Sequence, residues 1–129
     1  MIVDASAMIE VLLRTRKAAD VEMHLRAATD GLHVPHLVDV EVAQVLRRFV
    51  FRRELGAERA ARALEAHAQF PLQRHAHTTL LQRAWHWRDN LSAYDAIYVA
   101  LAEALDLPLV TCDARLGKAA GTLVNVLVV

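Results

Sequence analysis

The spacing of apolar residues predicts a chain built from helices with short strands between them. Helices are expected over residues 5–13, 17–28, 37–53, 57–68, 78–87, 91–105 and 114–119. In most of these segments apolar side chains recur three and four positions apart, which places them on one face of a helix. Each such face is expected to pack against a common core.

Short apolar runs between the helices predict the strands. These runs cover residues 1–3, 32–35, 70–72 (with an extension to Arg74 left open), 107–111 and 122–129. Because strands alternate with helices, successive strands are expected to be joined by right-handed crossovers, which gives a parallel sheet between two layers of helices. The predicted fold class is therefore α/β: one domain over residues 1–129, with a mostly parallel five-stranded sheet flanked by helices on both faces.

Residues at helix ends make these predictions more specific. Ser6 and Ser92 have side chains that can cap the first helix and the helix of residues 91–105. Gly56 is expected to end the helix of residues 37–53. The residues expected to face inward from the helix that follows Gly56 are Ala61, Leu64 and Ala68.

Composition limits the class of protein. Of 129 residues, 55% are hydrophobic and 23% are charged, which is typical of one globular domain with a hydrophobic core. Fifteen basic residues balance fifteen acidic ones, so nucleic-acid binding would have to come from local patches. The single cysteine, Cys112, excludes an internal disulfide and fits a reducing compartment. No signal peptide or membrane span is apparent, and we expect a cytoplasmic protein without a membrane partner.

Four carboxylates are predicted to meet at one edge of the sheet. Asp4 follows the first strand and Asp113 follows the run of residues 107–111. The carboxyl ends of parallel strands lie on the same edge, where α/β proteins bind ligands. Glu41 is expected in the first turn of the helix after the second strand, on the same rim. Asp95 is expected in the first turn of its own helix, among apolar neighbours.

Such a group of carboxylates predicts a metal site. Four negative charges on one rim repel one another unless a cation neutralises them. Oxygen ligands without cysteine favour Mg²⁺ or Mn²⁺ over zinc. An ion of this kind can activate water and stabilise phosphate charge, which suits phosphodiester hydrolysis. Taken singly, Asp4 and Asp113 could be helix caps and Glu41 could stabilise a helix dipole; their joint placement favours the metal site.

Four sequence motifs resemble those of PIN-domain ribonucleases, in the same order and spacing. More narrowly, they are similar to the VapC-type toxins of bacterial type II toxin–antitoxin pairs. The similarity extends over nearly the whole chain. The motifs are Ile2-Val3-Asp4-Ala5-Ser6, Glu41-Val42-Ala43-Gln44-Val45-Leu46-Arg47-Arg48, Tyr94-Asp95-Ala96 and Val110-Thr111-Cys112-Asp113-Ala114-Arg115-Leu116.

The resemblance implies an endoribonuclease that cuts RNA with a water activated by Mg²⁺ or Mn²⁺. It also implies a homodimer and a cognate VapB-type antitoxin that inhibits the enzyme with its C-terminal segment over the site. Ser6 and Thr111 match the family's supporting positions, and Arg115 stands where some members have another acidic residue. The implied catalytic and metal-binding residues are Asp4, Glu41, Asp95 and Asp113.

Arginines beside the predicted site are candidates for binding RNA. On an ideal helix Arg48 and Arg52 point in nearly the same direction as Glu41, roughly 10 Å and 16 Å further along the axis. A phosphate backbone leaving the metal site could follow them. Arg115, two residues after Asp113, is the better-placed candidate. The alternative is that the helical arginines form an ordinary solvated face.

Two other classes of protein share some of these features. A phosphoacceptor receiver domain also has an acidic Mg²⁺ pocket, but it needs paired acidic residues after the first strand and a lysine near the last strands. Asp4 stands alone and the final strands carry no lysine, so this class is excluded. The second is a non-catalytic PIN-like binding module, which would not bind a divalent metal ion.

Overall fold

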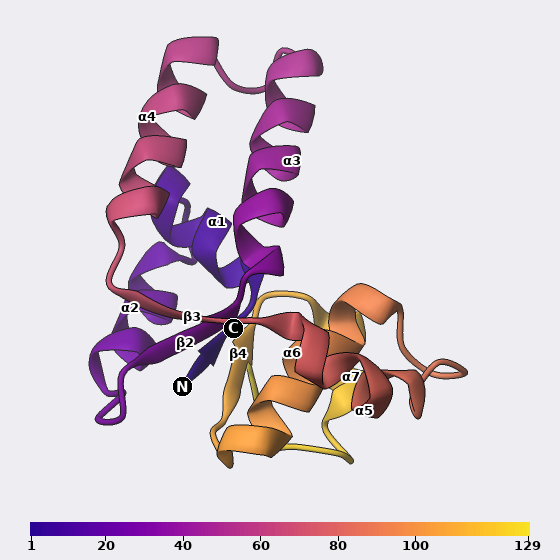
Figure 1. Cartoon of the computed structure of the whole chain (residues 1–129). Helices are drawn as coiled ribbons and strands as arrows, with labels where there is room; N and C mark the ends of the chain where they lie inside the picture. The colour runs from indigo at the N-terminus through magenta and orange to yellow at the C-terminus, as the bar shows by residue number, and fades with distance from the viewer.

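A five-stranded sheet forms the centre of the molecule (Figure 1). The computed structural model describes all residues from 1 to 129. The strand order is β3-β2-β1-β4-β5, and every neighbouring pair is parallel. The predicted α/β class is confirmed, with a sheet that is parallel throughout. The strands are β1 (Ile2–Val3), β2 (Leu32–Pro35), β3 (Leu72–His75), β4 (Leu109–Thr111) and β5 (Val126–Val128).

Helices cover both faces of this sheet. They are α1 (Ala5–Leu13), α2 (Ala18–Arg26), α3 (Leu37–Phe51), α4 (Ala57–Gln69), the 3₁₀ turn η1 (His77–Leu80), α5 (Leu81–Trp85), α6 (Ala93–Leu105) and α7 (Ala114–Ala120). The chain steps from β1 to β3 in one direction and from β4 to β5 in the other. Right-handed crossovers therefore place α1–α4 on one face and α5–α7 on the other (Figure 1). None of the helices is both long enough and apolar enough to cross a lipid bilayer.

A large part of the core lies between the sheet and α6. Every residue of α6 from Ala96 to Ala102 is buried, and the helix packs across β1, β2 and β4. The strands contribute side chains with no exposed surface, including Val3, Val34 and Val110. The apolar run that predicted this helix therefore anchors it on the middle of the sheet.

The N-cap of α6 was predicted correctly, and of the two candidates for α1 it is Asp4 and not Ser6 that caps the helix. Ser92 caps α6 by accepting a hydrogen bond from the backbone N–H of Asp95, at 3.1 Å. In α1 the N-cap is Asp4, whose carboxylate accepts from the backbone N–H of Ser6. Asp4 takes this role because it is the extended residue directly before the helix, whereas Ser6 is already its second residue, and the Ser6 hydroxyl is left for another contact.

The prediction that Gly56 ends α3 was wrong. The helix ends at Phe51, and Arg53 adopts a left-handed conformation with φ of 60° just beyond it. Gly56 is instead the N-cap of α4. The chain thus leaves the helix before it reaches Gly56, the only glycine in this region.

The inward face of α4 also differs from the prediction. The buried residues are Ala60, Ala63 and His67, whereas Leu64 is 42% exposed. His67 is only 2% exposed because its Nε2 hydrogen-bonds Asp39 of α3, at 2.8 Å. Hydrophobic spacing could not identify a face on which a polar residue takes the innermost position.

Candidate active site

The candidate site lies where the strand order reverses. β1 and β4 are neighbours at the centre of the sheet, and the chain leaves them toward opposite edges. The carboxyl ends of two such strands border a crevice, which is the usual ligand site of open α/β sheets. Asp4 directly follows β1, and Asp113 lies two residues beyond the end of β4. The fold therefore brings these carboxylates to one place, as predicted.

Asp4 is held by two hydroxyl groups. Its Oδ2 accepts hydrogen bonds from the Ser6 hydroxyl and from Thr111 Oγ1, the latter at 2.8 Å. Thr111 Oγ1 in turn accepts from the backbone N–H of Asp113 at 3.0 Å. Asp4 is only 7% exposed, and this burial raises the pKa of its carboxyl more than the two hydroxyls lower it. Ser6 and Thr111 thus fix the position of a carboxylate that is poorly solvated.

Glu41 projects from the second turn of α3. It is the fifth residue of the helix, and the first turn, where it was expected, carries Asp39 instead. The Tyr98 hydroxyl donates a hydrogen bond to Glu41 Oε2. Burial raises the pKa of Glu41, the Tyr98 hydrogen bond offsets part of this rise, and the charges of Asp4 and Asp95 add to it. These three carboxylates therefore interact through space.

Asp95 is the third residue of α6 and is half-buried. Its backbone N–H is bound by Ser92, whereas no hydrogen bond reaches its carboxylate. The adjacent Ala93 and Ala96 have small side chains that leave room beside it. Both carboxylate oxygens of Asp95 are therefore available to a ligand.

Asp113 differs from the other three carboxylates because it is already paired with a cationic side chain, that of Arg115. Its Oδ1 accepts from the backbone N–H groups of Arg115 and Leu116, at 2.8 Å and 3.3 Å, and so caps α7. Its Oδ2 accepts from Arg115 Nη2 at 3.3 Å. Partial burial acts to raise the pKa of Asp113, but the hydrogen bonds and charge of Arg115 and the capping N–H groups lower it overall.

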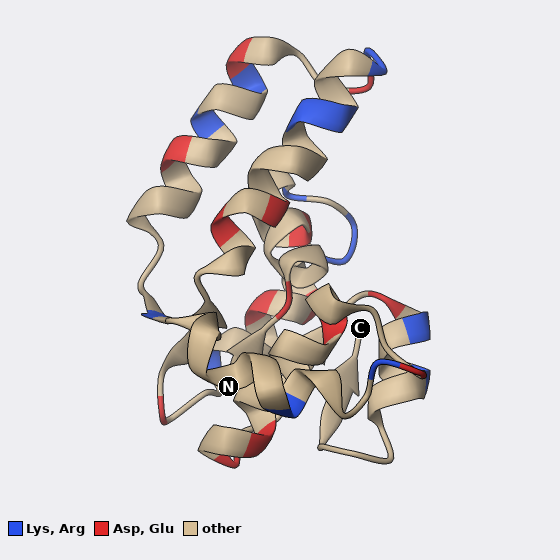
Figure 2. Ribbon diagram, turned by 45° about the vertical axis from the view of Figure 1, so that its right-hand side comes forward, with Lys and Arg blue, Asp and Glu red and all other residues tan.

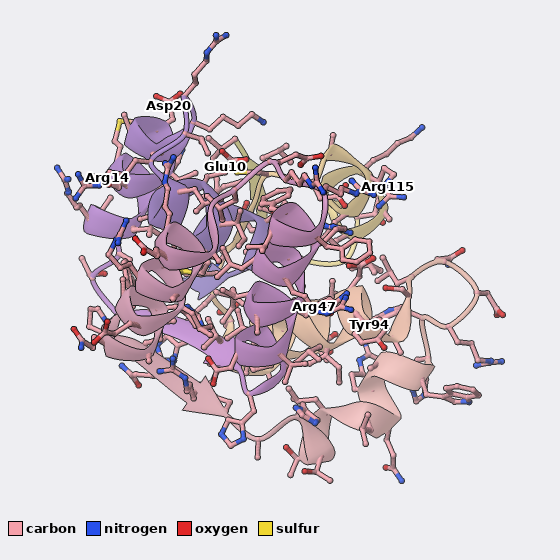
Figure 3. The ribbon with its side chains drawn as sticks, turned by 90° about the horizontal axis from the view of Figure 1, so that it is seen from above. Glu10, Arg14, Asp20, Arg47, Tyr94 and Arg115 are labelled. Carbon is pink, nitrogen blue, oxygen red and sulfur yellow. The ribbon has the colours of Figure 1, made fainter.

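An open, polar cleft of about 680 Å³ contains part of this group. Tyr94 and Arg115 reach it from α6 and α7 (Figure 3). Arg48 also lines the cleft, whereas Arg52 lies beyond the end of α3 and does not. Basic and acidic positions are interspersed along the ribbon (Figure 2). The residues that line the cleft are Glu41, Arg48, Asn90, Leu91, Ser92, Tyr94, Asp95, Arg115, Leu116 and Ala119.

The four carboxylates do not form a complete metal-binding site in this conformation. With the side chains as they lie, no three acidic, histidine or cysteine residues are arranged to hold a metal ion together. The cause is visible in their partners: Tyr98 holds one oxygen of Glu41, and Arg115 and the start of α7 hold Asp113. A cation would have to draw these side chains together. The donors that it would meet in the cleft are oxygen atoms, because no histidine or cysteine lines it.

Tyr98 is a residue of this site that the sequence did not reveal. It lies three residues after Asp95 on α6, so that both side chains lie on the same side of the helix. A buried tyrosine normally finds a hydrogen-bond partner for its hydroxyl. That general rule was the only signal in the sequence, and it did not name Glu41 as the partner.

The fold and the arrangement of carboxylates define a known class of protein. A model of the PIN domain matches residues 1–122, and the chain belongs to the PIN-domain family. Within that family it is similar to the VapC proteins: it is 47% identical to Ribonuclease VapC9 of Mycobacterium tuberculosis over 116 residues, which are 90% of this chain and 87% of that protein.

Two solved structures share the fold. The crystal structure of VapC20 from Mycobacterium tuberculosis, described as a sarcin–ricin loop cleaving toxin, has a TM-score of 0.70 at 15% identity and covers 92% of this chain and 93% of its own. VapBC2 from Rickettsia felis, bound to a DNA fragment from its promoter, has a TM-score of 0.67 at 10% identity. The match covers 98% of this chain and 96% of that one. At these identities the likeness concerns the fold.

Proposed function

We propose that this protein is a Mg²⁺- or Mn²⁺-dependent endoribonuclease and the toxin of a toxin–antitoxin pair. The observation that carries the proposal is that Asp4, Glu41 and Asp95 come from three distant segments and meet where the strand order reverses. Burial raises the pKa of Glu41, and the charges of Asp4 and Asp95 add to the rise. A divalent cation relieves repulsion between carboxylates. The naming of its relatives as VapC ribonucleases supports RNA as the substrate.

Asp4, Glu41 and Asp95 would hold the metal ion, and Asp113 would join them on leaving Arg115. Carboxylate oxygens without nitrogen or sulfur donors suit Mg²⁺ or Mn²⁺. When bound, such an ion lowers the pKa of water and stabilises negative charge on phosphate. The donor set of the cleft therefore fits the proposed cofactor.

The other residues of the site orient Asp4 or can contact the RNA. Ser6 and Thr111 keep Asp4 in place by donating to the same oxygen. Arg48 and Arg115 line the cleft with exposed guanidinium groups that can contact phosphate oxygens on either side of the cut. Arg52, further along the chain, would act only on a longer RNA.

The proposal is tested by cleavage of RNA by the purified protein with Mg²⁺, with Mn²⁺ and with EDTA. Cleavage is expected with either ion and not with EDTA. Asp95→Asn should reduce the rate by more than about a hundredfold, since even residues that contact metal ligands change metal affinity 10–100-fold. The matched control is Asp20→Asn, because Figure 3 places Asp20 on the opposite side of the molecule from Arg115. Cleavage in EDTA, or by Asp95→Asn at the wild-type rate, would overturn the proposal.

Titration with Mn²⁺ distinguishes a nuclease from the alternative, a non-catalytic binding module. A nuclease site of this composition saturates with the ion, whereas a scaffold without a functional site does not. Saturation that is lost in Asp95→Asn and kept in Asp20→Asn would exclude the alternative.

A VapB-type antitoxin is the expected partner, as in the VapBC2 complex. An apolar groove between α3 and α4 offers it a surface, with Phe51 81% exposed at one end and Leu46, Val50 and Leu64 along it. Exposed apolar grooves of this kind accept amphipathic helices. Phe51→Ser should weaken antitoxin binding at least about tenfold while leaving RNA cleavage unchanged.

We also expect a homodimer. Trp85 is 67% exposed and Leu81 is half exposed, and together they line a hollow of about 470 Å³ on α5. Large apolar side chains on a continuous surface mark association sites. Light scattering should give the dimer mass for the wild type, and Trp85→Ser should shift it toward the monomer.

A further inference from the structure

Tyr98 makes a buried contact that the proposed chemistry has not yet used. Its side chain is 1% exposed, and its hydroxyl reaches from α6 to Glu41 on α3. No other side chain hydrogen-bonds Glu41. The partners are separated by 57 residues, so the contact exists only in the folded chain.

The Tyr98 hydroxyl is confined to the role of donor. Burial raises the pKa of Tyr98 well above its ordinary value, and the nearby charges of Glu41 and Asp4 raise it further. In this contact the phenol O–H donates and Glu41 Oε2 accepts. A protonated phenol beside a carboxylate gives its hydrogen to that carboxylate.

This contact leaves the two oxygens of Glu41 unequal. Oε2 accepts from Tyr98, and no hydrogen bond reaches Oε1. The Glu41 side chain is held at its far end, while the backbone of α3 holds the near end. A long, flexible glutamate is thereby restricted to one arrangement that keeps it close to Asp4 and Asp95, whose charges act on it.

We propose that Tyr98 is a positioning residue for Glu41: its hydroxyl occupies Oε2 and presents Oε1 to the cation. This inference rests on the proposed metal-dependent nuclease. Tyr98 touches neither RNA nor the ion and acts only through Glu41. Groups that hydrogen-bond metal ligands in this way orient them and tune their affinity.

A structural explanation makes a different prediction. If the hydroxyl only satisfied a buried polar group, its removal would lower the free energy of unfolding and leave metal affinity unchanged. If it positions Glu41, metal affinity falls even where stability does not. Tyr98→Phe separates the two, because it keeps the buried ring and removes only the donor.

The experiment measures Mn²⁺ binding to the RNA-free protein by calorimetry, with RNA cleavage and thermal unfolding in parallel. Tyr98→Phe is expected to weaken Mn²⁺ binding about 10–100-fold, the usual effect of removing a partner of a metal ligand. The turnover rate should fall at subsaturating Mn²⁺, with KM for RNA within about twofold of wild type. Val99→Ala is the matched control, since it removes volume from a neighbouring buried position on α6 and should lower stability without changing Mn²⁺ affinity.

A double-mutant cycle tests whether Tyr98 affects Mn²⁺ binding through Glu41. If Tyr98 acts through Glu41, the variant Tyr98→Phe/Glu41→Gln binds Mn²⁺ no more weakly than Glu41→Gln alone. Additive losses, or Tyr98→Phe with wild-type affinity, would overturn the positioning role and leave the nuclease proposal intact. A wild-type protein that neither binds Mn²⁺ nor cuts RNA would overturn both.

Discussion

Arg115 neutralises Asp113 from two residues away. Its backbone N–H donates to Asp113 Oδ1 at 2.8 Å and its guanidinium to Oδ2 at 3.3 Å. Asp4, Glu41 and Asp95 have no such cation bonded to them. The four carboxylates thus divide into one that already has a counter-ion and three that lack one.

Arg115→Ala is therefore expected to have two opposite effects. Mn²⁺ should bind more tightly, by a few-fold, because Asp113 loses a competing cation that is itself exposed to solvent and screened. RNA should bind more weakly, and the slope of log affinity against log salt should fall by about 1 if one phosphate contact is lost.

Calorimetry with Mn²⁺ and filter binding of RNA over a salt series measure both effects. Arg62→Ala is the control, because Arg62 pairs only with Glu58 on the surface of α4. An unchanged salt slope in Arg115→Ala would remove Arg115 from the RNA-binding surface.

Asp4 makes stability depend on pH in the metal-free protein. Its pKa is raised in the folded state from the ordinary 3.8. The folded protein then binds the proton more tightly than the unfolded chain, so the stability linked to Asp4 is present at low pH and is lost as pH rises through the raised pKa. At pH values above the ordinary 3.8, wild type should gain stability on acidification relative to Asp4→Asn.

Thermal unfolding in EDTA at a series of pH values measures this difference. The contributions of Asp39 and Asp113 have the opposite sign, since their pKa values are lowered, and they fall below about pH 4. The other ionisable groups are present in both proteins, so the comparison isolates Asp4. Parallel pH profiles for wild type and Asp4→Asn would contradict the expected linkage.

Mn²⁺ should stabilise the folded protein. A ligand at a hundred times its dissociation constant adds about 2.7 kcal/mol to the free energy of unfolding. At that Mn²⁺ concentration the melting temperature of the wild type should rise by several degrees, while Glu41→Gln should show a smaller rise. Glu65→Gln, on the exposed side of α4, should behave as wild type. An equal rise in all three proteins would place the bound ion elsewhere.

Asp39 stabilises the fold without serving the site. Its carboxylate accepts from His67 Nε2 at 2.8 Å and from Arg74 Nε at 3.0 Å, which joins α3, α4 and β3. Asp39→Asn should lower the free energy of unfolding by about 1–2 kcal/mol, a value reduced because the side chain is 43% exposed. Urea unfolding measures the loss. RNA cleavage below the unfolding transition should be unchanged.

The sequence identified the sheet and its active edge because both follow from local patterns and one topological rule. Asp4 and Asp113 come directly after apolar runs, and parallel strands carry such residues to the same edge. Glu41 was expected in the first turn of its helix, but the helix starts at residue 37, as predicted, and this makes Glu41 the fifth residue, in the second turn.

Contacts between distant segments could not be predicted. Tyr98 and Glu41 are each compatible with many partners, and only the packing of α6 against the sheet brings them together. The same holds for His67, whose polar side chain can be buried because Asp39 on the facing helix hydrogen-bonds it. Hydrophobic spacing describes which surfaces are apolar and contains no information on such polar pairs.

The buried run of α6 has a consequence for the durability of the site. Asp95 and Tyr98 belong to a helix that is enclosed from Ala96 to Ala102, so the helix cannot open without exposing the centre of the core. Amide hydrogens in this run should exchange with solvent only when the whole domain unfolds. Fraying at chain ends and surface turns can then proceed without displacing these two side chains, and the site persists for as long as the native state itself.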